Sequence, residues 1–189
     1  MKYDPTQKVH RGQERVLKNI SQTFLDLLQT KAFEQISVRL ICEQSNYPRS
    51  TFYNYFSDKY DLLDYIWSTF ADEIIQENRP FTASLEDLYD HFDRIYDLIL
   101  SHLSSVKAVI KSNTLDGYVQ SSARNYLRRL SSQLISKHDV PKTELPMELL
   151  SEHCLSILLS VCEWIFIKNH ALTKTQAHEM IRKLYGYGA

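Results

Sequence analysis

Glycine and proline are scarce in this sequence, with four glycines and five prolines among 189 residues. A β-sandwich or barrel of this length needs many tight turns, which favour these two residue types. Hydrophobic residues make up 43% of the chain and charged residues 24%, so enough apolar surface is available to offset the entropy of folding. We therefore expect an all-α protein with one or two cores, and not a disordered chain.

Cysteine pairs and catalytic motifs are also absent. Cys42, Cys154 and Cys162 form no Cys-x-x-Cys pair and lie in apolar stretches, so we expect buried structural thiols and neither disulfides nor zinc ligands. The sequence has no His-x-x-x-His spacing, Gly-rich phosphate loop or Ser/His/Asp arrangement. We predict no enzymatic activity, no cofactor and no metal site.

Long apolar runs are missing too. No apolar segment of a signal peptide follows the first residues, and the apolar run at 154–167 has about 14 residues, fewer than the roughly 20 that span a bilayer. We expect a soluble, cytoplasmic protein that does not contact a membrane.

Charge is distributed unevenly along the chain. Residues 1–60 carry nine basic and six acidic side chains, a net charge of +3, and residues 61–189 carry the remaining 13 and 17, a net charge of −4. A basic N-terminal third on an acidic body is typical of a small DNA-binding unit joined to a second domain.

Apolar residues recur at helical spacing throughout and predict nine helices with no strand. The predicted helices cover residues 9–30, 38–44, 49–56, 58–78, 85–103, 106–113, 118–138, 147–169 and 174–185. Ser37, Ser84 and Thr173 are suitable N-caps for three of them. Asn46 tolerates the left-handed conformation that ends a helix, and Pro48 favours the start of the next, which predicts a helix-turn-helix.

The third predicted helix has two different faces. Phe52 and Phe56 lie four residues apart on one face, and we expect them to anchor the helix in a core. Polar residues and Tyr53 occupy the other face, which is free to contact a partner.

Residues 37–63 resemble the N-terminal DNA-binding domain of TetR-family transcriptional regulators. The resemblance rests on Thr-Phe-Tyr-Asn-Tyr-Phe at 51–56, followed by Lys59 and then Leu62. The family usually has Gly at the position of Asn46 and often Ser or Thr at that of Pro48. The resemblance implies a DNA-binding domain at 1–58 and a helical ligand-binding and dimerisation domain at 59–189.

The candidate DNA-binding residues are Ser37, Arg49, Ser50, Thr51, Tyr53, Asn54, Tyr55 and Lys59. The resemblance implies that Tyr53 and Lys59 bind backbone phosphates, with Ser37 and Tyr55 as further candidates. The alternative for both tyrosines is partial burial with the hydroxyl in solvent.

Base recognition is expected near the start of the third helix. Arg49 is placed either to bind guanine through two hydrogen bonds or to pair with a phosphate. The remaining polar residues of the helix, Ser50, Thr51 and Asn54, either touch bases or form exposed helix surface. Arg11 and Arg15 either follow the neighbouring groove or belong to a solvated helix face.

The stretch 154–167 is apolar on nearly every side, which requires burial both against its own domain and against a second surface. This stretch and the last helix are also similar to the dimerising helices of TetR-family members. The candidate interface residues are Leu155, Leu158, Leu159, Cys162, Ile165, Phe166, Met180, Ile181 and Leu184. The alternative is an ordinary core helix in a monomer.

The resemblance also implies an effector pocket among the middle helices. Candidate lining residues are Tyr89, Phe92, Tyr96, His102 and Tyr118, although aromatic residues at helical spacing more often fill a core. We predict a homodimeric regulator, most often a repressor in this family, that binds a palindromic double-stranded DNA operator and responds to an unknown small molecule. The alternative is a TetR-like adaptor that acts through a protein partner without recognising an operator.

Overall fold

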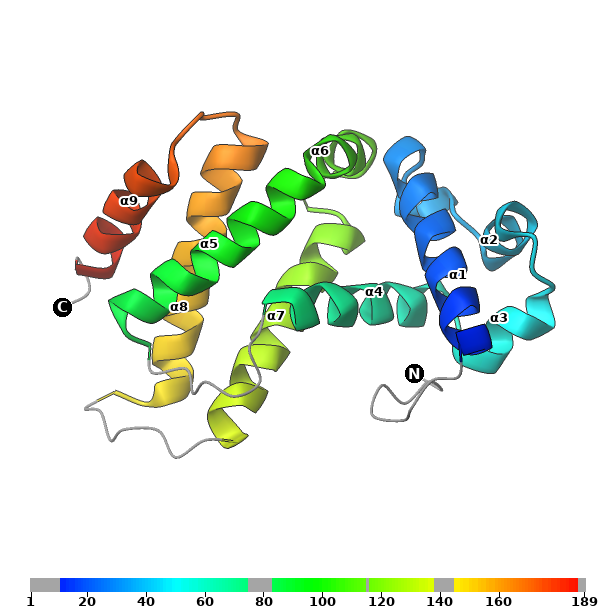
Figure 1. Ribbon diagram of the computed structural model, residues 1–189, viewed down its shortest axis with the longest axis horizontal. Coiled ribbons are helices and arrows are strands. Elements are labelled where there is room, and N and C mark those ends of the chain that lie inside the picture. The colour runs from blue at the N-terminus through cyan, green and yellow to red at the C-terminus, as the bar shows by residue number, and fades with distance from the viewer. Residues whose placement is uncertain (1–10, 75–82, 115, 138–144, 187–189) are drawn as a thin grey trace. The chain divides into compact units, whose positions relative to one another are not determined.

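The computed structural model describes residues 11–74, 83–114, 116–137 and 145–186 (Figure 1). These residues form nine α-helices, one 3-10 turn and one π-helical turn, with no strand among them. The all-α class and the nine predicted helices are confirmed.

The helix bounds agree closely with the sequence prediction. In chain order the helices are α1 (Arg11–Thr30), α2 (Val38–Ser45), α3 (Arg49–Tyr55), α4 (Lys59–Ile74), α5 (Leu85–Ser101), α6 (Leu103–Ser112), α7 (Tyr118–Lys137), α8 (Met147–Cys162) and α9 (Lys174–Gly186). A 3-10 turn, η1 (Phe33–Gln35), lies between α1 and α2, and a π-helical turn, η2 (Glu163–Ile167), continues α8. Predicted helical residues 9, 10, 75–78 and 138 lie outside the described residues.

Two differences have local causes. The prediction missed η1 because three residues are too few to show a periodicity. It also began α6 at residue 106 rather than at Leu103, because α5 and α6 are separated only by His102, whose φ of −117° and ψ of 19° break the helix without Gly or Pro.

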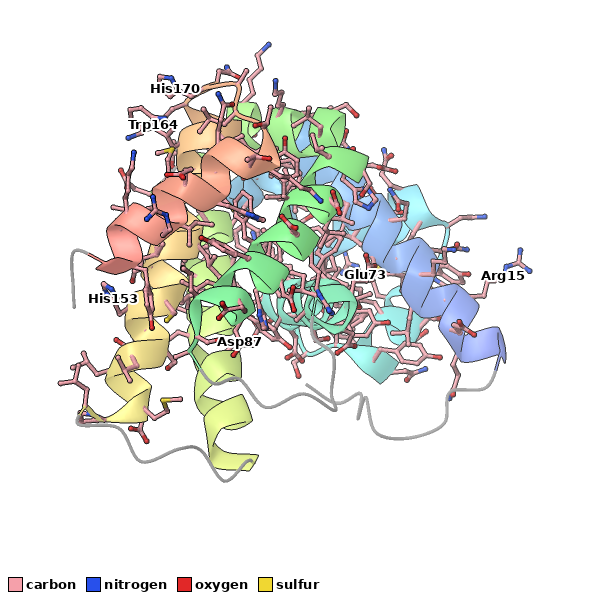
Figure 2. All side chains as sticks on the ribbon, turned by 60° about the vertical axis from the view of Figure 1, so that its left-hand side comes forward. Arg15, Glu73, Asp87, His153, Trp164 and His170 are labelled. Carbon is pink, nitrogen blue, oxygen red and sulfur yellow. The ribbon has the colours of Figure 1, made fainter. Side chains whose placement is uncertain are left out.

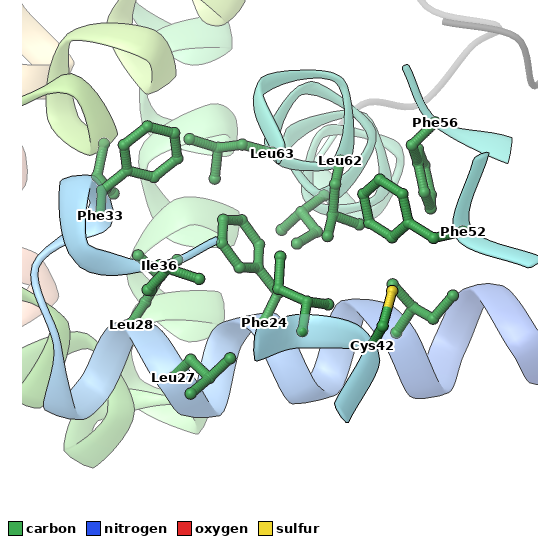
Figure 3. Close-up of a cluster of buried hydrophobic side chains, with 14 of the residues drawn as sticks. Phe24, Leu27, Leu28, Phe33, Ile36, Cys42, Phe52, Phe56, Leu62 and Leu63 are labelled. Carbon is green, nitrogen blue, oxygen red and sulfur yellow. The ribbon is translucent and has the colours of Figure 1, made fainter. Parts of the chain in front are cut away.

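The first of two compact units combines the N-terminal helices with Ser104–Ala123. Its core is made of side chains from α1, η1, α2, α3 and α4 (Figure 3). Phe24, Phe52, Phe56 and Leu62 are each fully buried there. Burying each such side chain contributes about 1.5–3 kcal/mol, so this core fixes α2 and α3 against α1 and α4.

The second unit contains α5, α8, η2 and α9, which contact one another in pairs. Phe92 of α5, Cys154 and Val161 of α8 and Ile181 of α9 lie in its core. Because the compact units divide α4 and α7 between them, they differ from the functional boundary expected between residues 58 and 59, which stays a prediction.

The predicted caps form in the structure. Ser37 Oγ accepts a hydrogen bond from Leu40 N–H at 3.2 Å, and Ser84 Oγ accepts one from Asp87 N–H at 3.2 Å. Thr173 shows the reciprocal capping box with Gln176, in which each side chain accepts from the other residue's backbone N–H. These bonds set where α2, α5 and α9 begin.

The helix formed by α8 and η2 runs from Met147 to Ile167 and is, at 21 residues, long and apolar enough to cross a membrane by length and hydropathy alone. The sequence analysis predicted this helix at 147–169 but compared only its apolar run, residues 154–167, with the length of a membrane span. Ile157, Leu158 and Phe166 are buried in the core of the second unit. Since the core helix of a soluble protein passes the same length test, this helix is weak evidence for a membrane span.

All three cysteines are free and buried, as predicted. Among the described residues, no group of three or more His, Cys, Asp or Glu side chains is arranged to hold a metal ion.

Candidate DNA-binding site

The helix-turn-helix is formed by α2, a short turn and α3. Asn46 adopts the left-handed conformation with a φ of 58°, and its backbone N–H donates to Cys42 C=O. Tyr47 N–H donates to the same carbonyl at 3.1 Å, and Pro48 C=O accepts from Thr51 N–H at 2.9 Å. Pro48 immediately precedes α3 and does not lie in its first turn. The turn thus closes as predicted with Asn at the left-handed position.

One face of α3 is fixed in the core. Phe52 and Phe56 are completely buried, and their ring centroids are 5.5 Å apart. Leu62 and Leu63 of α4 are buried in the same cluster (Figure 3). The predicted anchor is confirmed, and it holds the helix axis still while the opposite face remains accessible.

The opposite face of α3 presents Arg49, Ser50, Tyr53 and Asn54 to solvent. Tyr53 is 44% exposed, and its ring packs edge-on against Phe52 with centroids 5.6 Å apart. Thr51 and Tyr55 are half-buried beside this face. A helix that presents a cation, amide and hydroxyl groups has the donors that reach base edges and phosphates.

A hollow of about 420 Å³ lies beside the start of α3, lined by Arg39, Cys42, Glu43, Asn46, Tyr47, Pro48 and Arg49. Arg39 Nε pairs with Glu43 at 2.6 Å within α2. Burial raises the pKa of the Cys42 thiol, and the charge of Arg49 opposes this shift. Two arginines therefore border the turn, and Arg39 is a candidate phosphate contact that the sequence analysis missed, although its exposed position on α2 could have indicated it.

Ser37 has capacity for two roles. Its hydroxyl oxygen caps α2, and the residue is exposed to solvent. A hydroxyl accepts and donates at the same time, so the cap leaves the O–H proton available for a phosphate.

Lys59, which was expected to bind a DNA phosphate, contacts backbone carbonyls of its own chain. Its Nζ donates to Phe33 C=O at 2.7 Å and to Ile36 C=O at 2.8 Å. It also sits 4.2 Å from the centroid of the Phe33 ring. Partial burial lowers its pKa, and the charge of Glu34 opposes the shift. The ammonium group therefore holds the connection between α1 and α2, and its phosphate contact stays a prediction that depends on its third N–H.

Arg15 is exposed on α1 and extends away from the helix (Figure 2). The side chain of Arg11 lies outside the described residues. A groove contact by either arginine stays a prediction.

The candidate effector residues do not share one environment. Phe92 is fully buried, and Tyr96 contacts Phe166 with ring centroids 5.2 Å apart. Tyr89 stacks on His178 at 4.2 Å. The core alternative therefore fits these three, because they pack α5 against η2 and α9.

Two further effector candidates lie elsewhere. His102 is exposed at the end of α5. Tyr118 belongs to the first unit, where it stacks on Phe33 with centroids 4.9 Å apart. An effector pocket formed by these residues stays a prediction.

The candidate dimer residues fall into two groups. Buried within their own chain are Leu158, Cys162, Ile165, Phe166 and Ile181. These five side chains lie in the core of the second unit, and their part in a dimer interface stays a prediction. At least partly accessible are Leu155, Leu159, Met180 and Leu184.

Comparison with known proteins agrees with this site. Residues 24–66 match the family model described as bacterial regulatory proteins, tetR family. Over 64 residues the chain is 39% identical to the HTH-type dhaKLM operon transcriptional activator DhaS of Lactococcus lactis subsp. lactis (strain IL1403), covering 34% of each protein. The match thus spans about a third of the length of that relative.

Solved structures share the whole fold. A TetR transcriptional regulator from Streptococcus agalactiae 2603V matches with a TM-score of 0.61 at 19% identity, over 92% of this chain and 96% of that one. The dihydroxyacetone kinase operon activator DhaS matches with a TM-score of 0.55 at 21% identity, over 91% and 95%. The chain is thus an all-helical protein with a helix-turn-helix. Residues 24–66, which contain α2 and α3, are similar to bacterial regulatory proteins of the tetR family.

Proposed function

We propose that this protein is a transcriptional regulator that binds double-stranded DNA through α3. The observation that carries the proposal is the division of α3 into a buried Phe52 and Phe56 face and an exposed face with Arg49, Tyr53 and Asn54. A recognition helix needs to be held rigidly on one side and to expose polar side chains on the other, and α3 does both. No catalytic role is proposed.

We further propose that two copies bind a palindromic operator. The accessible side of the helix formed by α8 and η2 carries Leu149, Ser156, Ser160 and Trp164, and Leu184 is exposed on α9. A twofold dimer uses the same patch on both copies, and its recognition helices then fit half-sites about 34 Å apart. The small serines at the centre of this face allow two helices to approach closely.

The direction of regulation has two candidates. A repressor is the first, with a small-molecule effector that favours a dimer unable to match both half-sites. Activation is the second, because the matching relative from Lactococcus lactis is a transcriptional activator. A promoter fused to a reporter separates them, since deletion of the gene raises expression from a repressed promoter and lowers it from an activated one.

The test is selection of fragmented genomic DNA by the purified protein, with the Arg49→Ala and Asn54→Ala double variant as a matched control. The proposal predicts enrichment of a palindromic site by the natural protein and loss of that enrichment in the control. Absence of enrichment by the natural protein contradicts operator recognition and favours the adaptor, for which capture of a protein partner becomes the next experiment.

A further inference from the structure

Asn113 follows α6 directly and is buried, with 6% of its surface exposed. Its Nδ2 donates to Leu28 C=O and Val109 C=O, both at 3.0 Å, and to Lys31 C=O at 3.4 Å. Its Oδ1 accepts from Phe33 N–H at 2.8 Å. One amide side chain thereby satisfies the backbone at the end of α1 and the start of η1.

The end of α1 needs such partners. The last carbonyls of a helix accept no hydrogen bond from a backbone N–H of the same helix. The last turn of α1 also has no basic residue that could donate to them. The neighbouring Ser112 adds a bond, since its hydroxyl donates to Gln29 C=O at 2.8 Å. Residues 112 and 113 therefore cap a helix that lies more than 80 positions earlier in the chain.

The same connection is held from α4. Lys59 Nζ binds the carbonyls of Phe33 and Ile36, and Ile36 directly precedes Ser37, the N-cap of α2. Asn113 and Lys59 thus bind successive parts of residues 31–36. The start of α2, and with it the helix-turn-helix, is positioned by this pair of contacts.

We infer that Asn113 is a positioning residue for DNA binding, although it lies 47 residues beyond the end of the matched family domain. The inference rests on the proposed function. It makes the DNA-binding unit discontinuous: α1 to α4 need residues from the junction of α6 and α7 to hold α2 in place. Asn113 touches no DNA in this role.

The test uses the full-length Asn113→Ala variant in two measurements. Hydrogen exchange without DNA should be at least about tenfold faster at the Phe33 amide, because its acceptor is removed. Fluorescence anisotropy on a duplex from the genomic selection should show about tenfold weaker binding, in line with the loss of buried hydrogen bonds. The slope of log affinity against log salt should stay unchanged, because no contact between a cation and a phosphate is removed.

Two further variants keep the test decisive. Ser112→Ala loses a single hydrogen bond to α1 and should weaken DNA binding by about threefold. This variant replaces Asn113→Ala in the test if Asn113→Ala does not fold. Ser122→Ala is the control, because it removes hydrogen bonds with Trp67 and Val119 in the same unit and leaves the bonds made by Ser112, Asn113 and Lys59 in place. It should leave DNA affinity within about twofold.

The outcomes separate the inference from the proposed function. Unchanged affinity in both Asn113→Ala and Ser112→Ala, or an equal loss in Ser122→Ala, overturns the inference alone. A reduced salt slope in Asn113→Ala also overturns it, since that result indicates a phosphate contact. A natural protein that binds no DNA overturns the proposed function itself.

Discussion

At the scale of single residues, Arg49 and Tyr53 share the exposed face of α3 but have different expected roles. A guanidinium matches the two acceptors on the major-groove edge of guanine. A phenol offers one hydroxyl, which suits a phosphate oxygen common to every sequence. Specificity and general affinity should therefore respond to different substitutions.

Arg49→Ala is expected to relax the preference at one base position by about 1–3 kcal/mol, because a bidentate base contact is lost. Tyr53→Phe should weaken binding to all sequences by a similar factor, because a phosphate contact is sequence-independent. Selection from a randomised duplex library measures both. Equal effects of both variants on every sequence would contradict the assignment of roles.

The cysteines give a second residue-scale prediction. Burial raises the pKa of Cys154 to about 11 and that of Cys162 to about 12. At pH 7.5 both should react with iodoacetamide at least about tenfold more slowly in the folded protein than in urea, because the thiolate is the nucleophile. Mass spectrometry of labelled peptides measures the rates, and equally fast labelling in both states would show that these thiols are not buried.

The same pKa shifts determine whether the stability of the protein rises or falls with pH. The folded pKa values lie above the ordinary value for cysteine, so the stability that the protonated thiols contribute is complete below about pH 8.5 and is lost as the pH rises towards 11 and 12. The midpoint of urea unfolding should therefore fall above pH 9. The fall should be smaller in Cys154→Ala when each protein is compared with its own value at pH 8.

Residue-level prediction worked where local spacing decides the environment. The spacing of Phe52 and Phe56 correctly placed them in the core. Sequence could not reveal the contacts of Lys59, because its carbonyl acceptors are 26 and 23 residues away and backbone acceptors carry no residue signature. The same holds for Asn113, whose partners lie in another part of the chain.

At the scale of elements, the turn between α2 and α3 depends on Asn46. Its φ of 58° is in the left-handed region, which Gly and Asn tolerate and β-branched residues do not. The orientation of α3 against α2 therefore depends on the residue type at this position.

Asn46→Val should destabilise the first unit by about 1–3 kcal/mol because it forces strain into the turn, whereas Asn46→Gly should stay within about 0.5 kcal/mol of the natural protein. Urea unfolding followed by Trp67 fluorescence in a Trp164→Phe background reports on the first unit. A valine variant as stable as the glycine variant would show that the turn does not need a left-handed residue.

Helices were predictable from the sequence because apolar periodicity and caps act over a few residues. The packing of the helices against one another was less predictable. The apolar character of residues 154–167 on nearly all sides predicted burial against their own domain and against a second surface, and Leu158 and Phe166 lie in the core of the second unit. Burial by distant helices of the same protomer produces the same pattern as burial by a second copy.

At the scale of the whole molecule, the accessible face of α8 determines the proposed assembly. Trp164 is 39% exposed and stacks on His170 with ring centroids 4.0 Å apart (Figure 2). Ser156 and Ser160 are exposed one turn apart on the same helix. The stacked rings of Trp164 and His170 form a large aromatic surface, and the small side chains of Ser156 and Ser160 leave the helix surface beside it low.

Ser160→Glu should give a monomer, because it places a like charge on both copies where the two helices approach. Operator affinity should fall by about a hundredfold or more, since the second half-site is no longer bound in the same event. Sedimentation velocity and anisotropy measure the two effects, with Asn125→Glu on α7 as the control for added charge. A Ser160→Glu dimer with full affinity would contradict this interface.

Anisotropy titration of the selected palindromic duplex and of a scrambled duplex, each at 50 and 200 mM salt, tests the central claim most directly. The account predicts saturation at two protomers per duplex, preference for the palindrome by about a thousandfold or more, and weaker binding at high salt on both duplexes. Equal affinity for the two duplexes, or no binding to either, would contradict a DNA-recognising role for α3.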